Sequence, residues 1–257
     1  MPDKYASMDS QLGYAECEVE DTEEMFWLRE LDDYQSMVSL GNALVGQYRF
    51  QDAIEVYEKA SRIKENDGML YVRLGGSNLS IFRYEEAMKN YQRALSCGIP
   101  EKSVAYSIGV WHYLKGQYQT AADWWKKCLP CGGEMKIAVI YWHTLAAYRG
   151  GFEPELLQEY RADMDAGHHI AYKTAVSVFA GERDWNQVPA TNHALDDAVL
   201  FYGLSVYLEK LGENAEVEHD IDKVLEQESV WPCISYLAAW NDRNKNIKQK
   251  KFPLVFV

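Results

Sequence analysis

The chain has 257 residues, of which 47% are hydrophobic, and it carries a net charge of −13 at pH 7. This length allows either one elongated repeat array or two compact domains, and the apolar fraction is ample for a core. The negative charge and the lack of a basic patch or basic amphipathic helix in the body of the sequence argue against nucleic acid and membranes as partners.

No apolar run approaches the roughly 20 residues that a membrane-spanning helix needs. The first residues, MPDKYASMDS, lack the apolar core of a secretory signal. The five cysteines are an odd number spread through helical patterns, so they fit reduced thiols better than a disulfide framework. We therefore expect a cytoplasmic protein.

Residues 1–33 form an acidic N-terminal segment, in which 11 acidic and two basic residues give a net charge of −9. Its acidic residues lead into the apolar cluster of Met25, Phe26, Trp27, Leu28 and Leu31. This pattern predicts a helix with a negatively charged first turn. We expect the helix to cap the helix pair that follows, with a regulatory segment lying in a groove as the alternative.

A period of 34 residues begins at Tyr34. It covers three clear repeats in residues 34–130 and a degenerate fourth in residues 131–165, where His143 and Glu155 replace a glycine and an alanine. The recurring positions are Leu40, Leu74 and Ile108; Gly41, Gly75 and Gly109; Ala53, Ala87 and Ala121; and Tyr57, Tyr91 and Trp125.

A fixed period of this length, with Leu-Gly in a first helix and Ala followed by an aromatic residue in a second, resembles the tetratricopeptide repeat (TPR) family. The resemblance implies an all-α fold, a right-handed α-solenoid of stacked antiparallel helix pairs across residues 34–165. Each pair has an apolar face too wide to bury alone, so neighbouring pairs stack. We expect the recurring glycines and alanines to mark the places where helices touch.

Residues 166–246 lose the strict period but keep helical patterns, and we expect divergent helical repeats with a C-terminal cap. The predicted helices are His168–Ala180, His193–Leu211, Glu213–Glu228 and one from Trp231 through Trp240. Residues 247–257 form a separate tail, basic as far as Lys251 and apolar from Phe252 onward. An exposed apolar end of this kind needs a cover.

Catalytic motifs are scarce. Cys128 and Cys131 have CxxC spacing, but they follow a helix and no second CxxC completes a zinc site. His168 and His169 are adjacent, so on a helix their side chains diverge by roughly 100°. No Gly-rich phosphate loop, HExxH or GxSxG motif occurs. The sequence therefore predicts no enzyme, no cofactor and no metal.

Asn78 and His112 occupy one slot in consecutive repeats, on the side that faces the interior of the stack. Buried polar groups need hydrogen bonds, so we expect a mutual contact or one to the backbone.

The TPR resemblance further implies that a peptide binds along the concave surface of the first helices. Only Asn42 matches the carboxylate clamp of some TPR domains, since Val38, Ser103 and Ser107 stand where that clamp needs Lys or Arg. Arg73 is the only nearby cation. The groove is otherwise apolar and tyrosine-rich, so the ligand should offer apolar or aromatic anchors with little charge. The predicted groove residues are Val38, Asn42, Met69, Val72, Arg73, Leu79, Tyr106, Val110, Tyr113, Ile140, Thr144 and Tyr148.

Three functions compete. The first is a non-catalytic scaffold or chaperone-like adaptor that binds an apolar or aromatic segment of a protein partner. The second is a structural protein whose own termini fill the groove, with homo-oligomers formed through the C-terminal tail. The weakest alternative is a thiol- or metal-dependent enzyme that uses Cys128 and Cys131.

Overall fold

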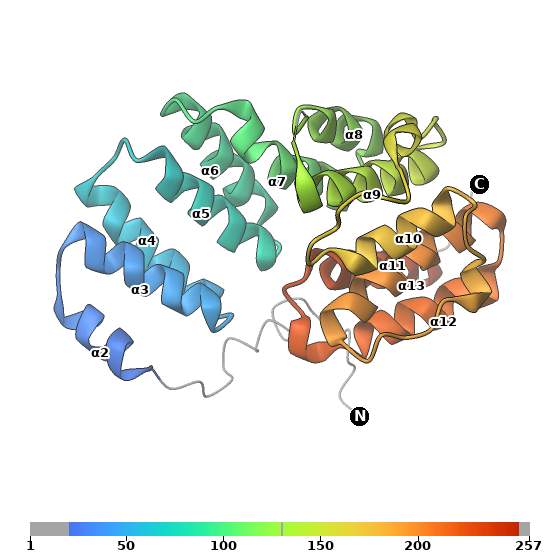
Figure 1. Ribbon diagram of the computed structural model, residues 1–257. Coiled ribbons are helices and arrows are strands. Elements are labelled where there is room, and N and C mark those ends of the chain that lie inside the picture. The colour runs from blue at the N-terminus through green and yellow to red at the C-terminus, as the bar shows by residue number, and fades with distance from the viewer. Residues whose placement is uncertain (1–20, 130, 252–257) are drawn as a thin grey trace, which may run out of the picture. The chain divides into compact units, whose positions relative to one another are not determined.

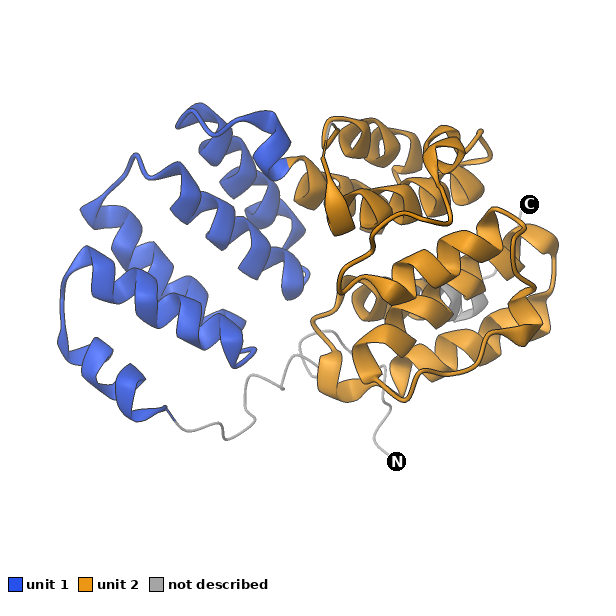
Figure 2. Cartoon of the chain, in the orientation of Figure 1, with its two compact units in different colours: residues 1–104 blue, residues 105–257 orange. Residues whose placement is uncertain are grey.

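The computed structural model describes residues 21–129 and 131–251, without the side chains of residues 245–251. The chain divides into two compact units, Met1–Val104 and Ala105–Val257 (Figure 2). The described residues form twelve α-helices, with short 3-10 turns and no strand (Figure 1). The predicted all-α fold of stacked antiparallel helix pairs is therefore confirmed within each unit.

Unit 1 consists of a short end helix and two helix pairs. The end helix is α2 (Glu23–Glu30), followed by α3 (Tyr34–Gly46) with α4 (Phe50–Ile63), and by α5 (Gly68–Ser80) with α6 (Tyr84–Ser96). Each helix packs against the next in chain order from α2 to α6. Helix α7 (Glu101–Leu114) then crosses the division between the units.

Local signals repeat at the 34-residue step. Asp33 and Asp67 cap α3 and α5, because each carboxylate accepts hydrogen bonds from backbone N–H groups two and three residues later. The turn into each second helix requires a left-handed residue, which is Tyr48 at φ 63°, Phe82 at φ 59° and Gly116 at φ 76°. The turn between the two helices therefore has the same backbone conformation in all three repeats.

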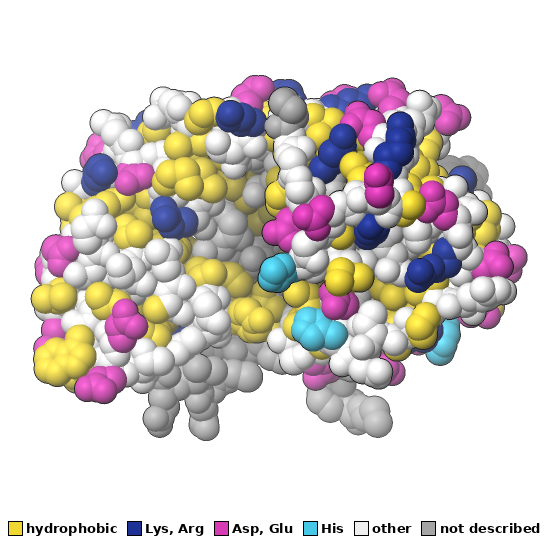
Figure 3. All heavy atoms as spheres, in the orientation of Figure 1, with side chains coloured by type: hydrophobic (Ala, Val, Ile, Leu, Met, Phe, Trp, Pro, Cys, Tyr) yellow, Lys and Arg dark blue, Asp and Glu magenta, His cyan; other side chains and the backbone are white. Residues whose placement is uncertain are grey.

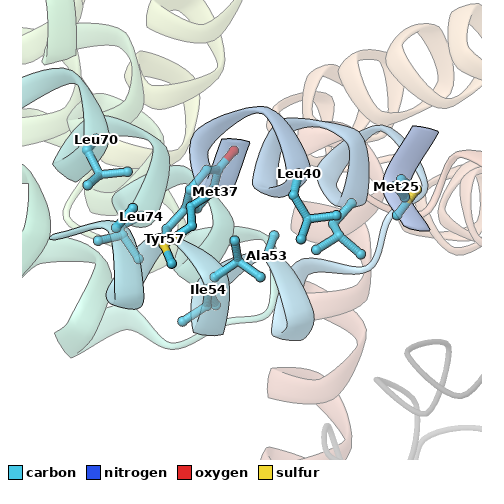
Figure 4. Packing of buried hydrophobic residues seen from close by; sticks show 11 residues of the cluster. Met25, Met37, Leu40, Ala53, Ile54, Tyr57, Leu70 and Leu74 are labelled. Atoms are coloured by element: carbon cyan, nitrogen blue, oxygen red, sulfur yellow. The ribbon is translucent and has the colours of Figure 1, made fainter. Parts of the chain in front are cut away.

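The core of unit 1 lies between the end helix and α5 (Figure 4). Its glycines are where helices touch. A Cβ atom on Gly41 would stand 2.3 Å from the ring of Tyr57, and one on Gly75 would stand 2.4 Å from the ring of Tyr91. In unit 2, Gly109 meets Trp125 in the same way, at 2.6 Å. The recurring glycines and aromatics are thus the two halves of one contact, made within each helix pair.

Unit 2 contains the rest of the third repeat and the C-terminal helices. After α8 (Tyr118–Lys126) come α9 (Gly133–Gly150), α10 (Ile170–Phe179), α11 (Ala194–Leu211), α12 (Asn214–Leu225) and α13 (Ile234–Lys251). Short 3-10 turns lie at Glu155–Glu159, Trp185–Gln187 and Glu228–Val230. Helix α11 packs against α9, α10, α12 and α13, and it is buried along most of its length.

The fourth repeat departs from the expected helix pair. Its second member is only η2 (Glu155–Glu159), a 3-10 turn of five residues. Glu155 stands in the alanine slot and Glu159 in the aromatic slot, and neither carboxylate suits a buried helix contact. They pair at the surface instead, Glu155 with Lys126 at 2.6 Å and Glu159 with Lys136 at 2.8 Å. Leu156 and Tyr160 are buried, but the two carboxylates remove the apolar contacts that a longer helix would need at those two slots.

One boundary in the C-terminal third differs clearly from expectation. Helix α13 continues to Lys251 rather than ending near Trp240, so the basic part of the predicted tail is helical. Residues 252–257 lie outside the described part of the chain, as do residues 1–20. The expected helix before Gly212 is confirmed as α11, and Gly212 caps it at φ 82°. The domain boundaries at residues 33, 165 and 246 stay a prediction.

No helix in the described ranges has the length and apolar character that crossing a membrane requires.

Candidate functional site

A pocket of about 360 Å³ lies in unit 1 between α3 and α5, with residues of α4 among its lining. Its lining combines apolar side chains with three polar side chains that are joined by hydrogen bonds and with small residues of α5. The lining residues are Asn42, Val45, Phe50, Tyr57, Arg73, Gly76, Ser77 and Ser80.

Three polar side chains of this pocket are joined through Asn42. The Tyr57 hydroxyl donates to Asn42 Oδ1 at 2.7 Å, and Arg73 Nε donates to the same oxygen at 3.1 Å. Since both neighbours are donors, they fix which end of the amide is the oxygen. Burial raises the pKa of Tyr57 to about 12, so its hydroxyl keeps its proton at neutral pH.

The remaining polar atoms of this group are unused donors. Asn42 Nδ2 and the two terminal nitrogens of Arg73 make no hydrogen bond within the described residues, and no described carboxylate forms an ion pair with Arg73. Such groups donate hydrogen bonds to a carbonyl or carboxylate oxygen of a ligand. Val45 and Phe50 provide apolar surface beside them. The pocket is therefore suited to an apolar side chain with an oxygen acceptor close to it.

The pocket contains two of the six groove residues predicted in unit 1, Asn42 and Arg73. Met69 is 46% exposed, while Val38 and Val72 are half-buried. Leu79 is buried, so its side chain offers no surface to a ligand. The pocket itself was not predicted from the sequence. The small residues Gly76, Ser77 and Ser80, which line it together with Arg73, are the feature that could have indicated a hollow there.

The other half of the predicted groove lies in unit 2, where most of its side chains are packed inside. Val110, Tyr113, Ile140 and Thr144 are each 2% exposed or less. Helices α10 and α11 pack against α9, which carries Ile140 and Thr144. On α7, the ring of Tyr113 contacts Trp142 of α9 and Tyr202 of α11. Tyr106 and Tyr148 remain half-exposed. The buried residues contact neighbouring helices in place of a partner.

A second pocket, of about 440 Å³, lies in unit 2 over a buried ion pair. Arg149 Nη1 donates to Asp242 Oδ2 at 2.6 Å and to the Tyr202 hydroxyl at 3.1 Å, and its Nε donates to Glu209 at 3.2 Å. Cationic and acidic side chains alternate around this pocket, with Val206, Val217 and Ile221 as its apolar part. Because the positive and negative side chains are interspersed, the pocket has no strong net potential that would favour a charged ligand of either sign.

The interior polar slot of the repeats is occupied as expected in the second repeat. Asn78 is buried and donates from Nδ2 to the backbone oxygen of Leu74 at 2.8 Å. His112 instead is half-exposed, and its Nδ1 lies 2.6 Å from Gln117 Oε1. This position is therefore partly exposed in α7, where the side chain of His112 contacts Gln117 in the turn that follows the helix.

The cysteine pair is poorly suited to chemistry. Burial, and the neighbouring thiol of Cys131, raise the pKa of Cys128 to about 11. Burial also raises the pKa of Cys131. Reactive cysteines need the opposite shift. Among the described residues, no group of three or more His, Cys, Asp and Glu side chains could hold a metal ion.

The face of the molecule in Figure 3 carries Lys and Arg side chains dispersed among acidic and apolar ones. The described residues on that face form no continuous basic patch.

Residues 35–66 match the family model of the tetratricopeptide repeat. This range corresponds to α3 and α4, and the glycine-aromatic contact of that pair recurs in the next two repeats. The chain therefore contains a tetratricopeptide repeat at residues 35–66.

The chain is also similar to a solved structure, the crystal structure of YrrB, which is described as a TPR protein with an unusual peptide-binding site. The two sequences are 16% identical, the match covers 86% of this chain and 98% of the other, and the TM-score is 0.46. A likeness of this size says nothing about what this chain binds. No curated protein matches the sequence.

Proposed function

We propose that this protein is an interaction scaffold that binds an extended segment of a protein partner at the pocket between α3 and α5. The observation that carries the proposal is the set of unused donors on Arg73 and Asn42 beside an apolar hollow. An aromatic or aliphatic side chain fills the hollow, and a neighbouring carbonyl or carboxylate oxygen accepts from Arg73. A chaperone-like adaptor of this kind needs no catalytic group.

The apolar lining and the hydrogen-bond donors of the pocket together indicate which class of ligand it binds. Its apolar lining takes one side chain, so the ligand needs an apolar or aromatic anchor. The unused nitrogens of Asn42 and Arg73 are donors and Arg73 is a cation, so a basic residue beside the anchor is disfavoured. This refines the expected ligand, which was an apolar segment with little charge, by adding one oxygen acceptor next to the anchor.

Binding can be tested with the full chain and short synthetic peptides that carry one Phe, Leu or Trp in a Gly/Ser background, each with or without an adjacent Glu. Fluorescence anisotropy should show saturable binding that is strongest with the adjacent Glu. Replacing Arg73→Met should weaken it by about tenfold or more, as expected for a hydrogen bond to a charged group. Arg62→Met is the matched control, since Arg62 is exposed on α4 and lies outside the pocket. Equal affinity of both variants, or no saturable binding, contradicts the proposal.

A further inference from the structure

Helix α2 exposes an apolar face at the end of the helix pairs of unit 1. Met25 is only 1% exposed and packs into the core, with Leu28 partly buried beside it. Phe26 and Trp27 are each 59% exposed, and Leu31 is 53% exposed. Of the ten large hydrophobic side chains exposed in the described ranges, these three fall within six residues. End elements of repeat arrays usually carry a polar outer face, whereas this apolar face has no cover among residues 21–129 and 131–251.

Acidic side chains border this apolar face. Glu23 lies one turn from Trp27, and Glu30 lies one turn from Phe26. Glu23, Glu24, Glu30 and Asp32 are all exposed, and none of them forms an ion pair or side-chain hydrogen bond within the described residues. A partner for this face must therefore combine apolar side chains with positive charge.

The face is held in place by its own helix and by α4. Thr22 caps α2 by accepting from Met25 N at 3.3 Å. Asp21 binds Arg29 on α2 and also accepts from Arg49, the residue before α4, at 2.5 Å. These hydrogen bonds, that to Arg29 first, lower the pKa of Asp21 to about 2. The surface is thus formed before any partner arrives, which lowers the entropy that binding must overcome.

Net charge distinguishes the segments of this sequence that could bind the apolar face of α2. The same face of a second copy would bring carboxylates together. Residues 1–20 contain five acidic residues and one lysine, a net charge of −4, and are repelled for the same reason. Residues 247–257, IKQKKFPLVFV, have three lysines, no acidic residue and a run of apolar side chains. They are complementary in both charge and hydrophobicity.

We propose that α2 of one copy binds residues 247–257 of a second copy. Contact between copies joins two different surfaces of the same chain, so it is a head-to-tail contact that forms rings or open chains of copies. Binding of the segment to α2 of its own copy would instead leave the protein a monomer.

The test is a charge exchange on the full chain, followed by sedimentation velocity over a range of concentrations. The unmodified protein should associate in a concentration-dependent manner. One variant carries Glu23→Lys, Glu24→Lys and Glu30→Lys, and the other carries Lys248→Glu, Lys250→Glu and Lys251→Glu. Each variant alone should remain a monomer. Mixing the two should restore association, because each supplies the charge that the other has lost.

A matched control places three reversals on another surface of unit 1, at the exposed Glu55, Glu58 and Glu86, and association should persist. Replacing Trp27→Ser should weaken association about tenfold or more, and circular dichroism should show that the variant stays folded. The free peptide IKQKKFPLVFV should dissociate the oligomers.

Three results would overturn the proposal. The first is a monomer at every concentration. The second is association that the lysine reversals leave intact. The third is a constant monomer mass together with a change in tryptophan emission on lysine reversal that is absent in the Trp27→Ser background, which would assign the segment to its own copy. None of these results bears on the pocket between α3 and α5, so the proposed function stands or falls separately.

Discussion

The ring of Tyr91 occupies the place where a Cβ atom on residue 75 would stand, at a distance of 2.4 Å. Gly75 therefore allows α5 and α6 to approach each other, and the aromatic side chain fills the space that the glycine leaves. The same pairing joins Gly41 to Tyr57.

Gly75→Ala should destabilise the protein by about 1–3 kcal/mol, because a methyl group must displace a fully buried ring. Helix propensity works in the opposite direction by about 1 kcal/mol. Gly76→Ala is the control, since a Cβ there meets nothing within 4 Å, and this variant should be neutral or slightly stabilising. Urea unfolding followed by circular dichroism measures both. Similar effects of the two substitutions would contradict the packing role of Gly75.

His143 should make stability depend on acid. It is fully buried, and neither ring nitrogen has a hydrogen-bond partner. Burial first, and then Lys126, lower its pKa from 6.5 to about 4. The unfolded chain therefore takes up the proton more readily than the folded one. Stability from the neutral imidazole is fully present above pH 6.5 and is lost as pH falls from 6.5 toward 4.

Replacing His143→Leu should remove this part of the pH dependence, which amounts to at most about 3 kcal/mol. The measurement is the difference in unfolding free energy between the two proteins at pH 7.5 and pH 4.5, which cancels the titration of all other groups. His168→Leu is the control, because the side chain of His168 is 99% exposed. An identical pH profile for His143→Leu and the unmodified protein would contradict the prediction.

Asp242→Asn should destabilise unit 2 by roughly 3 kcal/mol, because it leaves the mostly buried Arg149 without its closest counter-ion. Glu209→Gln removes the other carboxylate that contacts Arg149, but Glu209 is 52% exposed, so its loss should cost less than about 1 kcal/mol. Urea unfolding monitored by tryptophan emission compares the two. If the two substitutions lowered the free energy of unfolding equally, burial of the Arg149–Asp242 pair would not explain the effect.

Cys128 should react slowly with iodoacetamide. A pKa of about 11 in place of 9 leaves roughly 100-fold less thiolate near neutral pH. Mass spectrometry of tryptic peptides after timed alkylation measures the rate for each cysteine, with glutathione as the reference thiol. Rapid alkylation of Cys128, or stoichiometric zinc in the purified protein, would revive the enzyme alternative.

The period of 34 residues was enough to predict the first three repeats, because each glycine, alanine and aromatic residue in it has one structural role. It could not predict the burial of Ile140 and Thr144. That burial depends on α10 and α11, which lie beyond the period and contact α9 through side chains without a recurring pattern. The pocket beside Arg73 depends on small residues, whose missing volume has no periodic signal.

The glycine and the aromatic ring of each contact belong to the same 34-residue unit, sixteen positions apart in all three repeats. A unit that is duplicated, deleted or exchanged as a whole therefore carries both halves of its internal fit with it. Such a change disturbs only the surfaces between neighbouring units. The glycine-aromatic contact that packs α5 against α6 therefore also allows the repeat to be gained or lost as one unit during evolution.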